Sequence, residues 1–259
     1  MQQFLVWITP NSRATSADRS FILIAWIVGA FLLWEFADIP FLPKPGEVLD
    51  AFGTLRQNGT FLEFGTSIWT MAEALFWTCL ISLGLAYASV LPAIRPLVTF
   101  VAGLRYLGLV GLMLVFTLLA PNGHDLKVAV LTFGITVFYL RDMVAVVNGI
   151  PQERYDHAKT LGMGPIQMVF EVVVMGTLAD ALESLRVNAA MGWMMLTMVE
   201  GVVRSEGGIG VVLLNMNRHM DLAAEAAILI ALFCVGLTQD FLIGVARDEV
   251  FCRYAKVQR

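Results

Sequence analysis

Residues 155–164 have the sequence YDHAKTLGMG, a short polar stretch in a chain that is otherwise mostly apolar. It follows Pro151 and an acidic residue, Glu153, a pattern typical of a helix start, because proline suits the first turn and acidic side chains favour the positive end of a helix. Gly162 then allows the chain to leave the helix, and Pro165 begins the next segment. The stretch therefore predicts a short polar helix with a corner, between two apolar segments.

The composition of the whole chain indicates a membrane protein. Of 259 residues, 58% are hydrophobic and 15% are charged, and the mean hydropathy is +0.74. A soluble domain with a polar surface does not carry so many apolar residues. Because about 20 apolar residues cross a bilayer core of roughly 30 Å, a chain of this length holds about six crossings and no large further domain. We expect an all-α, polytopic membrane helical bundle of about six transmembrane helices.

Six apolar runs are candidates for these crossings. They cover residues 21–36, 67–91, 97–120, 128–150, 185–203 and 222–246. A further apolar run, 166–182, is short and has charges in and around it, so we expect an amphipathic or half-buried helix there, leading into the fifth crossing. Val48, Leu49, Phe52 and Leu55 have helical spacing after a proline-rich turn, which fits a short amphipathic helix or a plain connecting loop.

The positive charges predict which side of the membrane each segment faces. With six crossings both termini lie on one side, and cytoplasmic segments are enriched in lysine and arginine. Most of the 17 lysines and arginines fall on the cytoplasmic side if the N-terminus is placed there. We therefore expect N-in and C-in topology, with residues 1–20 as a cytoplasmic N-terminal segment. Residues 21–259 then form a single transmembrane domain whose loop at about 151–165 faces the cytoplasm.

Four stretches of the chain resemble the permease subunits of binding-protein-dependent ABC importers. The cytoplasmic loop of that family typically reads E-A-A, three residues, then G, and the matching stretch here is DHAKTLG, from Asp156 to Gly162. The stretches LPKPGEVL, LRVNAAMGWMMLTMVEG and SEGGIGVVLLNMNRHMD resemble the nitrate, sulfonate and taurine branch. The resemblance implies the ABC importer permease fold and a pathway for a small solute, such as the oxyanions nitrate and sulfonate, or taurine.

The resemblance also implies partners and a location. The chain would work with ABC ATPase subunits, with a second permease subunit in a homodimer or a heterodimer, and with an extracytoplasmic substrate-binding protein. It would be a multi-pass protein of the bacterial inner (plasma) membrane, surrounded by membrane lipid. The family's cytoplasmic loop forms a coupling helix that docks into a cleft of the ATPase.

The docking role carries over to the polar stretch residue by residue. Ala158 would let the helix approach its socket closely, Gly162 would permit the positive φ that ends the helix, and the charged residues would dock by polar contacts. The implied coupling residues are Glu153, Tyr155, Asp156, His157, Ala158, Leu161 and Gly162. His157 departs from the family's alanine, and Met175 and Ala179 stand where the family usually has prolines. The third crossing, with LRYLGLVGLM, also lacks the family's prolines.

A charged residue in the third crossing is the first candidate for the translocation pathway. Arg105 lies eight residues into its apolar run, between Gly103 and Gly108. Charges inside a membrane usually face the protein interior or a water-filled path, and a guanidinium group suits oxyanions. Two hypotheses stay open: Arg105 attracts an anionic solute, or it forms a structural ion pair with Glu73 or Glu200.

The fifth crossing supplies three more pathway candidates: Trp193, Met194 and Glu200. Methionines at helical spacing are equally typical of simple packing. For Glu200 we expect a structural role near the outer gate, as a partner for an arginine or for backbone. We expect Arg186, at the start of the crossing, to extend toward the cytoplasmic interface.

The sequence also argues against several functions. The net charge is −4 and no basic run is present, so nucleic acid is not an expected partner. The three histidines and three cysteines are scattered and no P-loop is present, so we expect no catalytic site, no metal and no cofactor, and ATP hydrolysis by a separate subunit. The alternative function is an ion-coupled secondary transporter or channel without an ATPase. It would require inverted repeats with broken helices around paired acids, and the sequence has no such repeat.

Overall fold

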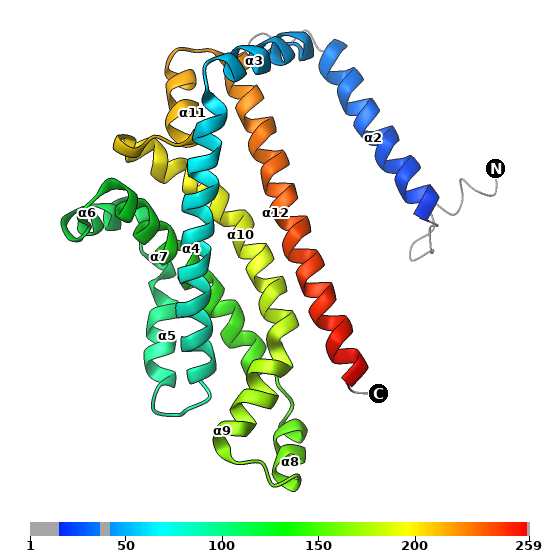
Figure 1. The fold of residues 1–259 in the computed structure, drawn as a ribbon, viewed down its shortest axis with the longest axis vertical. Helices are drawn as coiled ribbons and strands as arrows, with labels where there is room; N and C mark the ends of the chain where they lie inside the picture. The colour runs from blue at the N-terminus through cyan, green and yellow to red at the C-terminus, as the bar shows by residue number, and fades with distance from the viewer. Residues whose placement is uncertain (1–15, 37–41, 258–259) are drawn as a thin grey trace.

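Helices account for every regular element in the residues that the computed structural model describes, 16–36 and 42–257. Long helices run side by side through the middle of the molecule (Figure 1). Short helices close its two ends: α3 and α11 lie at one, the α3 end, and α8 and α9 at the other, the α8 end (Figure 1). The helices are α2 Ser16–Phe36, α3 Pro45–Gln57, α4 Thr60–Ala88, α5 Arg95–Gly103, α6 Leu109–Leu119, α7 Gly123–Asn148, α8 Gln152–Thr160, α9 Pro165–Met168, α10 Leu178–Val202, α11 Ile209–Arg218 and α12 Leu222–Val257. The expected all-α fold is confirmed.

The described residues contain three helices that are long and apolar enough to cross a membrane. They are Thr60–Ala88, Gly123–Asn148 and Leu222–Glu249, and the bent pair Arg95–Tyr106 and Gly111–Leu119 makes a fourth if it is counted as one span. The apolar part of α2, Ser20–Phe36, is shorter. The number six and the N-in orientation therefore stay predictions, and most of the predicted N-terminal segment lies outside the described residues.

The third predicted crossing is a bent pair of helices, so whether it spans the membrane stays a prediction. α5 runs into a 3₁₀ turn, η1 Leu104–Tyr106, after which Leu107 and Gly108 are extended, with ψ values of 128° and 124°. The two apolar helices on either side of this break differ in direction by 116°. Two consecutive extended residues interrupt the i→i−4 hydrogen bonds, which is why the helix axis changes direction there.

Small side chains bring α4 and α7 close together. Thr78 Oγ1 donates a hydrogen bond to the Thr132 carbonyl at 3.4 Å, and Ser82 Oγ donates one to the Thr136 carbonyl at 3.3 Å. Short polar side chains of this kind allow two membrane helices to approach and bond across their interface. Around this contact, α4, α7 and α10 share a hydrophobic core that includes Met71, Leu131 and Leu196.

The amphipathic helix expected near residue 50 is present as α3. Val48 and Leu55 are buried in a cluster with residues of α4, α11 and α12, whereas Leu49, expected on the same face, is exposed. The Trp34 indole Nε1–H donates to the Pro43 carbonyl at 2.9 Å and so fixes the end of α2 to the chain before α3. The rest of α2 stands apart from the body of the molecule (Figure 1).

The segment between α9 and α10 is helical but irregular. A π-helical stretch, η2 Val169–Val174, leads into a 3₁₀ turn, η3 Met175–Thr177, and only then does α10 begin. Val173 and Thr177 are buried while Ile166 and Phe170 are exposed, which agrees with the half-buried character expected for residues 166–182. Because π and 3₁₀ turns often mark hinges, this segment is a candidate hinge between α8 and α10.

Candidate functional site

The polar stretch forms α8 and ends in the expected corner. Pro151 is the N-cap residue, with extended backbone at φ −62° and ψ 140°. At the other end Gly162 has φ 72°, the left-handed conformation that favours glycine. Its N–H donates to the Lys159 carbonyl at 2.9 Å, and the Met163 N–H donates to the Ala158 carbonyl at 3.2 Å. This pair of bonds is the Schellman arrangement that ends a helix, so the positive φ expected at Gly162 is confirmed.

The residues of α8 divide into an outer and an inner face. Glu153, Asp156, His157 and Leu161 are exposed, Leu161 by 62%. Ala158 is buried, with 3% of its surface exposed, on the side where α8 contacts α9 and η2. Ala158 is therefore not one of the exposed residues of α8, and its role in docking stays a prediction.

Two further residues complete the description of this region: Tyr155 in α8 and Ile166 in α9. Tyr155 is half-buried, and this burial raises the pKa of its phenol, which therefore stays protonated near neutral pH. Ile166, at the start of α9, is 87% exposed. Exposed apolar side chains beside charged ones are typical of protein contact surfaces. Ile166 comes shortly after the corner, next to Pro165. Sequence analysis did not predict that this apolar residue would be exposed.

A second candidate site is a groove between α10, α11 and α12. Its lower part, nearer the α8 end, has a volume of about 550 Å³, and its upper part, nearer the α3 end, about 390 Å³. Thr197 and Leu213 line both parts, so the two parts adjoin. The lower part is also lined by Arg186, Ala189, Ala190, Trp193, Met194, Leu229, Leu232, Phe233, Gly236, Leu237, Gln239 and Asp240. The upper part is also lined by Met198, Gly201, Val202, Gly210, Leu214, Asn217 and Glu225.

The groove contains only two of the four predicted pathway residues. Trp193 and Met194 line its lower part, and the Trp193 Nε1–H donates to the Gln239 Oε1 at 2.8 Å. Arg105 and Glu200 are not among the groove residues. The structure thus does not bring the four predicted residues together.

Arg105 lies instead at the break between α5 and α6. Its guanidinium donates to the Tyr106 hydroxyl at 2.6 Å and lies 4.6 Å from the centre of that ring. Glu73 forms its ion pair with His124, at 2.9 Å, and Glu200 is bound by other groups. The proposed ion pair of Arg105 with Glu73 or Glu200 is therefore wrong.

Arg186 is held at the lower end of the groove by a carboxylate on α12. Its Nε and Nη2 atoms donate to the two carboxylate oxygens of Asp240 at 2.6 and 2.7 Å. Such bidentate, charge-assisted pairs fix both partners. Sequence analysis did not predict this ion pair, and the expectation that Arg186 extends toward the cytoplasmic interface stays a prediction. Asp240 was missed, although an acid inside the apolar run 222–246 is the same kind of signal that identified Arg105.

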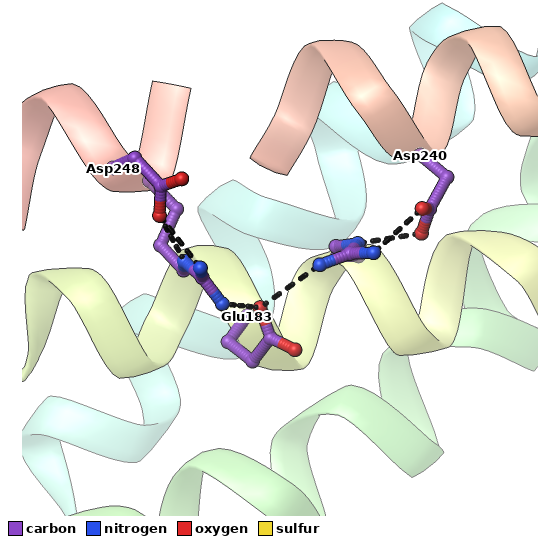
Figure 2. Close-up of polar contacts among 5 residues, drawn as sticks. Glu183, Asp240 and Asp248 are labelled. Atoms are coloured by element: carbon purple, nitrogen blue, oxygen red, sulfur yellow. Dashed lines mark hydrogen bonds and ion pairs between the residues drawn. The ribbon is translucent and has the colours of Figure 1, made fainter. Parts of the chain in front are cut away.

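The pair belongs to a larger network that joins α10 to α12. Figure 2 shows Glu183 between two guanidinium groups, with Asp240 on one side and Asp248 on the other. The Arg247 Nη1 lies 2.7 Å from the Glu183 carboxylate, and its Nη2 lies 2.6 Å from that of Asp248. Two positive and three negative groups thus alternate along the contact, which holds the lower halves of the two helices together.

Glu200 lies in a cluster at the α3 end that we call the latch, formed by Glu63, Ser67, Lys127, Glu200 and the backbone from Gly207 to Gly210. Glu200 is 1% exposed and accepts hydrogen bonds from Ser67 Oγ at 2.7 Å and from the Gly210 N–H at 2.9 Å. Glu63 accepts from the Gly208 N–H, and the Lys127 ammonium donates to the Gly207 carbonyl at 2.6 Å. The expectation of a backbone partner for Glu200 is confirmed.

The position of the latch explains why acidic residues are used. Both carboxylates bind N–H groups at the start of α11, where a helix carries a partial positive charge. The latch therefore connects α4, α7 and α10 to the loop before α11 without an arginine. Sequence analysis found Glu200 but missed Glu63 and Lys127, which looked like ordinary charges at the ends of spans.

Comparison with known proteins places the chain beside transport permeases. It is 24% identical over 217 residues to the taurine transport system permease protein TauC of Escherichia coli strain K12, covering 78% of this chain and 77% of TauC. It is 28% identical over 115 residues to a predicted ABC transporter permease protein of Methanocaldococcus jannaschii, covering 43% of this chain and 42% of that protein. No family model matches the chain.

The fold also has a solved counterpart. A chain of the MetNI methionine ABC transporter, in an inward-facing conformation, superimposes with a TM-score of 0.61 at 15% sequence identity, covering 72% of this chain and 94% of that chain. The chain is thus similar in sequence to two proteins named as transport permeases, and similar in fold to a chain of an ABC transporter. Together with the apolar helices, these similarities indicate a multi-pass membrane protein.

Proposed function

We propose, from the sequence similarity to transport permeases, that the chain is the permease subunit of an ATP-driven ABC importer of the bacterial inner membrane. It pairs with a second permease subunit, homodimeric or heterodimeric, and receives its solute from an extracytoplasmic binding protein. One observation supports the coupling role above all others. The polar stretch is a separate short helix at one end of the molecule, with charged and apolar side chains exposed on its outer face.

The proposed coupling surface consists of the outer face of α8 and the residue that follows the corner. Glu153, Asp156, His157 and Leu161 offer polar and apolar contacts to an ATPase cleft, and Ile166 extends them. Tyr155 and Ala158 act from the inner face by holding α8 against α9 and η2, and Gly162 sets the corner. Movement of the ATPases would then pass through the irregular segment η2 and η3 into α10.

The solute is the finer part of the proposal. Taurine is named for the relative TauC, and we propose a small organic solute of that general kind. Nitrate and other inorganic oxyanions fit less well, because the expected cation, Arg105, does not line the groove. Trp193 and Met194 line the proposed pathway, whereas Glu200 acts beside it in the latch.

The alternative, an ion-coupled transporter without an ATPase, is less well supported. A broken helix is one of its expected features, and the chain does have a break between α5 and α6. In the described residues this break carries Arg105 and Tyr106 rather than paired acids. A channel of that class also gives no reason for a separate, exposed α8.

The test of the coupling role is Gly162→Val. A Cβ atom at position 162 meets nothing within 4 Å, so its effect comes from the backbone: a side chain at φ 72° costs about 1–3 kcal/mol. We expect the variant to insert and dimerise, yet to bind the ATPase more weakly or to uncouple hydrolysis from uptake. Solute uptake and ATPase activity are measured in proteoliposomes with the complex purified from native membranes.

Two matched controls accompany this test. Gly164 has φ −70° and equally open surroundings, so Gly164→Val should be tolerated. Asp156→Lys should impair coupling by charge reversal, whereas Gln152→Lys on the same helix should have little effect. Full uptake together with full binding-protein-stimulated hydrolysis in Gly162→Val would refute the coupling role.

A further inference from the structure

The charges along the groove all lie at its two ends. Arg186 is the only cation among the described residues that line it, and the bidentate contact with Asp240 neutralises this cation. Between the ends the lining is mainly aliphatic and aromatic, with the hydroxyl of Thr197 in the middle. No free cation in the described lining is available to bind an anionic solute.

The upper end has an acidic group with no cationic partner among the described residues. Glu225 accepts hydrogen bonds from the Asn217 amide at 3.2 and 3.3 Å, and none of the described ion pairs includes it. An amide orients the carboxylate but does not cancel its charge. The upper part of the groove is therefore lined by a carboxylate that attracts cations.

The polar groups of the groove also indicate what fills it. A lipid tail or an apolar helix would cover the Glu225 carboxylate and the Asn217 amide with groups that cannot hydrogen-bond, which is unfavourable for a charged group. Water and a polar solute satisfy them. The apolar stretch below accommodates a hydrocarbon portion of the solute.

We propose that the groove is a water-filled path for small organic solutes that carry a positively charged amine, and that Glu225 is the residue that selects for this charge. The proposal rests on the proposed transport function and makes it more specific. A zwitterion with an amine is admitted, whereas an inorganic oxyanion, which has no positive group, is disfavoured at the mouth.

The charge preference is measured with a cysteine placed inside the groove. Thr197→Cys is made in the full-length chain with Cys79, Cys234 and Cys252 replaced by serine, and the protein is reconstituted in nanodiscs. Two thiol reagents of similar size and opposite charge are compared: trimethylammonioethyl methanethiosulfonate and sulfonatoethyl methanethiosulfonate. Their rates are normalised to those with a small free thiol. Neither an ATPase nor a binding protein is required, so failure here is distinguishable from failure of the coupling test.

We expect both reagents to react and the cationic one to be favoured. Glu225→Gln should lower that preference roughly fourfold, the effect that Coulomb's law gives for two opposite probe charges about 10 Å from one carboxylate in water. The matched control is Glu206→Gln, which removes a carboxylate at the same end of the molecule but lines a different pocket, with His124 and Lys127. It should leave the preference unchanged.

Three results would overturn the proposal. If neither reagent reacts, the groove is filled by lipid or by another protein segment. If the anionic reagent is favoured, the path selects for anions. If Glu225→Gln and Glu206→Gln lower the preference equally, the charge of the whole surface is responsible and Glu225 has no selective role.

Discussion

At the scale of single residues, two glycines place the polar groups on which the proposed function depends. The left-handed backbone at Gly162 ends α8 and sets the angle of the corner. Gly210 serves a different purpose, because it allows the first turn of α11 to lie against α10, where its N–H reaches Glu200. Substitutions at the two sites should therefore fail in different ways, one in coupling and the other in folding.

Gly210→Ala should destabilise the protein at the latch. A Cβ atom at this position would lie 2.3 Å from the Thr197 carbonyl oxygen and 2.8 Å from the Glu200 Cβ, so backbone would have to move. Overpacking of this kind typically costs about 1–3 kcal/mol. The melting temperature of the purified protein in detergent should fall, while Gly111→Ala, where a Cβ meets nothing within 4 Å, should leave it unchanged. Equal melting temperatures for the two variants would mean that the latch does not limit stability.

Single residues also show which features of the candidate site could be predicted from sequence patterns. The corner at Gly162 was predictable because backbone geometry is encoded locally, by a glycine after a helix. The inward direction of Ala158 was not, since it depends on where α9 and η2 pack against α8. Glu200 could be assigned a structural role from its position in an apolar run, but its partner Ser67 lies 133 residues away in sequence.

At the scale of elements, α10 and α12 form a pair held by charged groups at one end of the groove. Arg186 and Asp240 are both about a third exposed, so water weakens their attraction, yet their geometry is bidentate. The pair fixes the lower width of the groove. Loss of one partner should disturb this helix contact more than loss of both.

A double-mutant cycle tests the pair. Arg186→Met leaves Asp240 without its cation and should lower the melting temperature, as should Asp240→Leu alone. The double variant should recover part of the loss, because neither Arg186 nor Asp240 is then left without its partner. Strictly additive effects of the two substitutions would show that the contact is not coupled. Lys159→Gln, which breaks an exposed pair with Asp156, should have almost no effect.

The break between α5 and α6 is a feature that sequence analysis did not predict. Hydropathy averages over residues 97–120 are the same for a straight and a bent segment, so they do not register a break at Leu107 and Gly108. The positions of α4, α7, α10 and α12 were predictable because their apolar runs have clear polar ends. Helix boundaries were less predictable. The fifth run was expected to begin at Leu185, whereas α10 begins at Leu178.

At the scale of the whole molecule, we propose different functions for the two ends. The α8 end would meet the ATPase, and the α3 end, which contains the latch and the mouth of the groove, would meet the binding protein. These assignments require the two ends to lie on opposite sides of the membrane. α2 ends near α3, and α12 runs from the α3 end toward the α8 end, as this arrangement needs (Figure 1).

Cysteine labelling tests this topology. Asn58, between α3 and α4, and Gln152, at the start of α8, are both exposed. In a chain without its own cysteines, Asn58→Cys should react with a membrane-impermeant maleimide in intact spheroplasts. Gln152→Cys should react only after the membrane is opened. Labelling of both positions in intact spheroplasts would contradict the predicted arrangement, and so would labelling of Gln152→Cys alone.

The isolation of α2 from the rest of the molecule has a consequence for biosynthesis. α2 is made before the other described helices, and apart from its Trp34 end it stands apart from the body, so it can leave the translocon into lipid without waiting for another helix. α10 is in the opposite position, because its buried Glu200 and its Arg186 require α4, α11 and α12 as partners. We therefore expect α10 to remain at the translocon until α12 has been made, so that synthesis of α12 completes the insertion of α10.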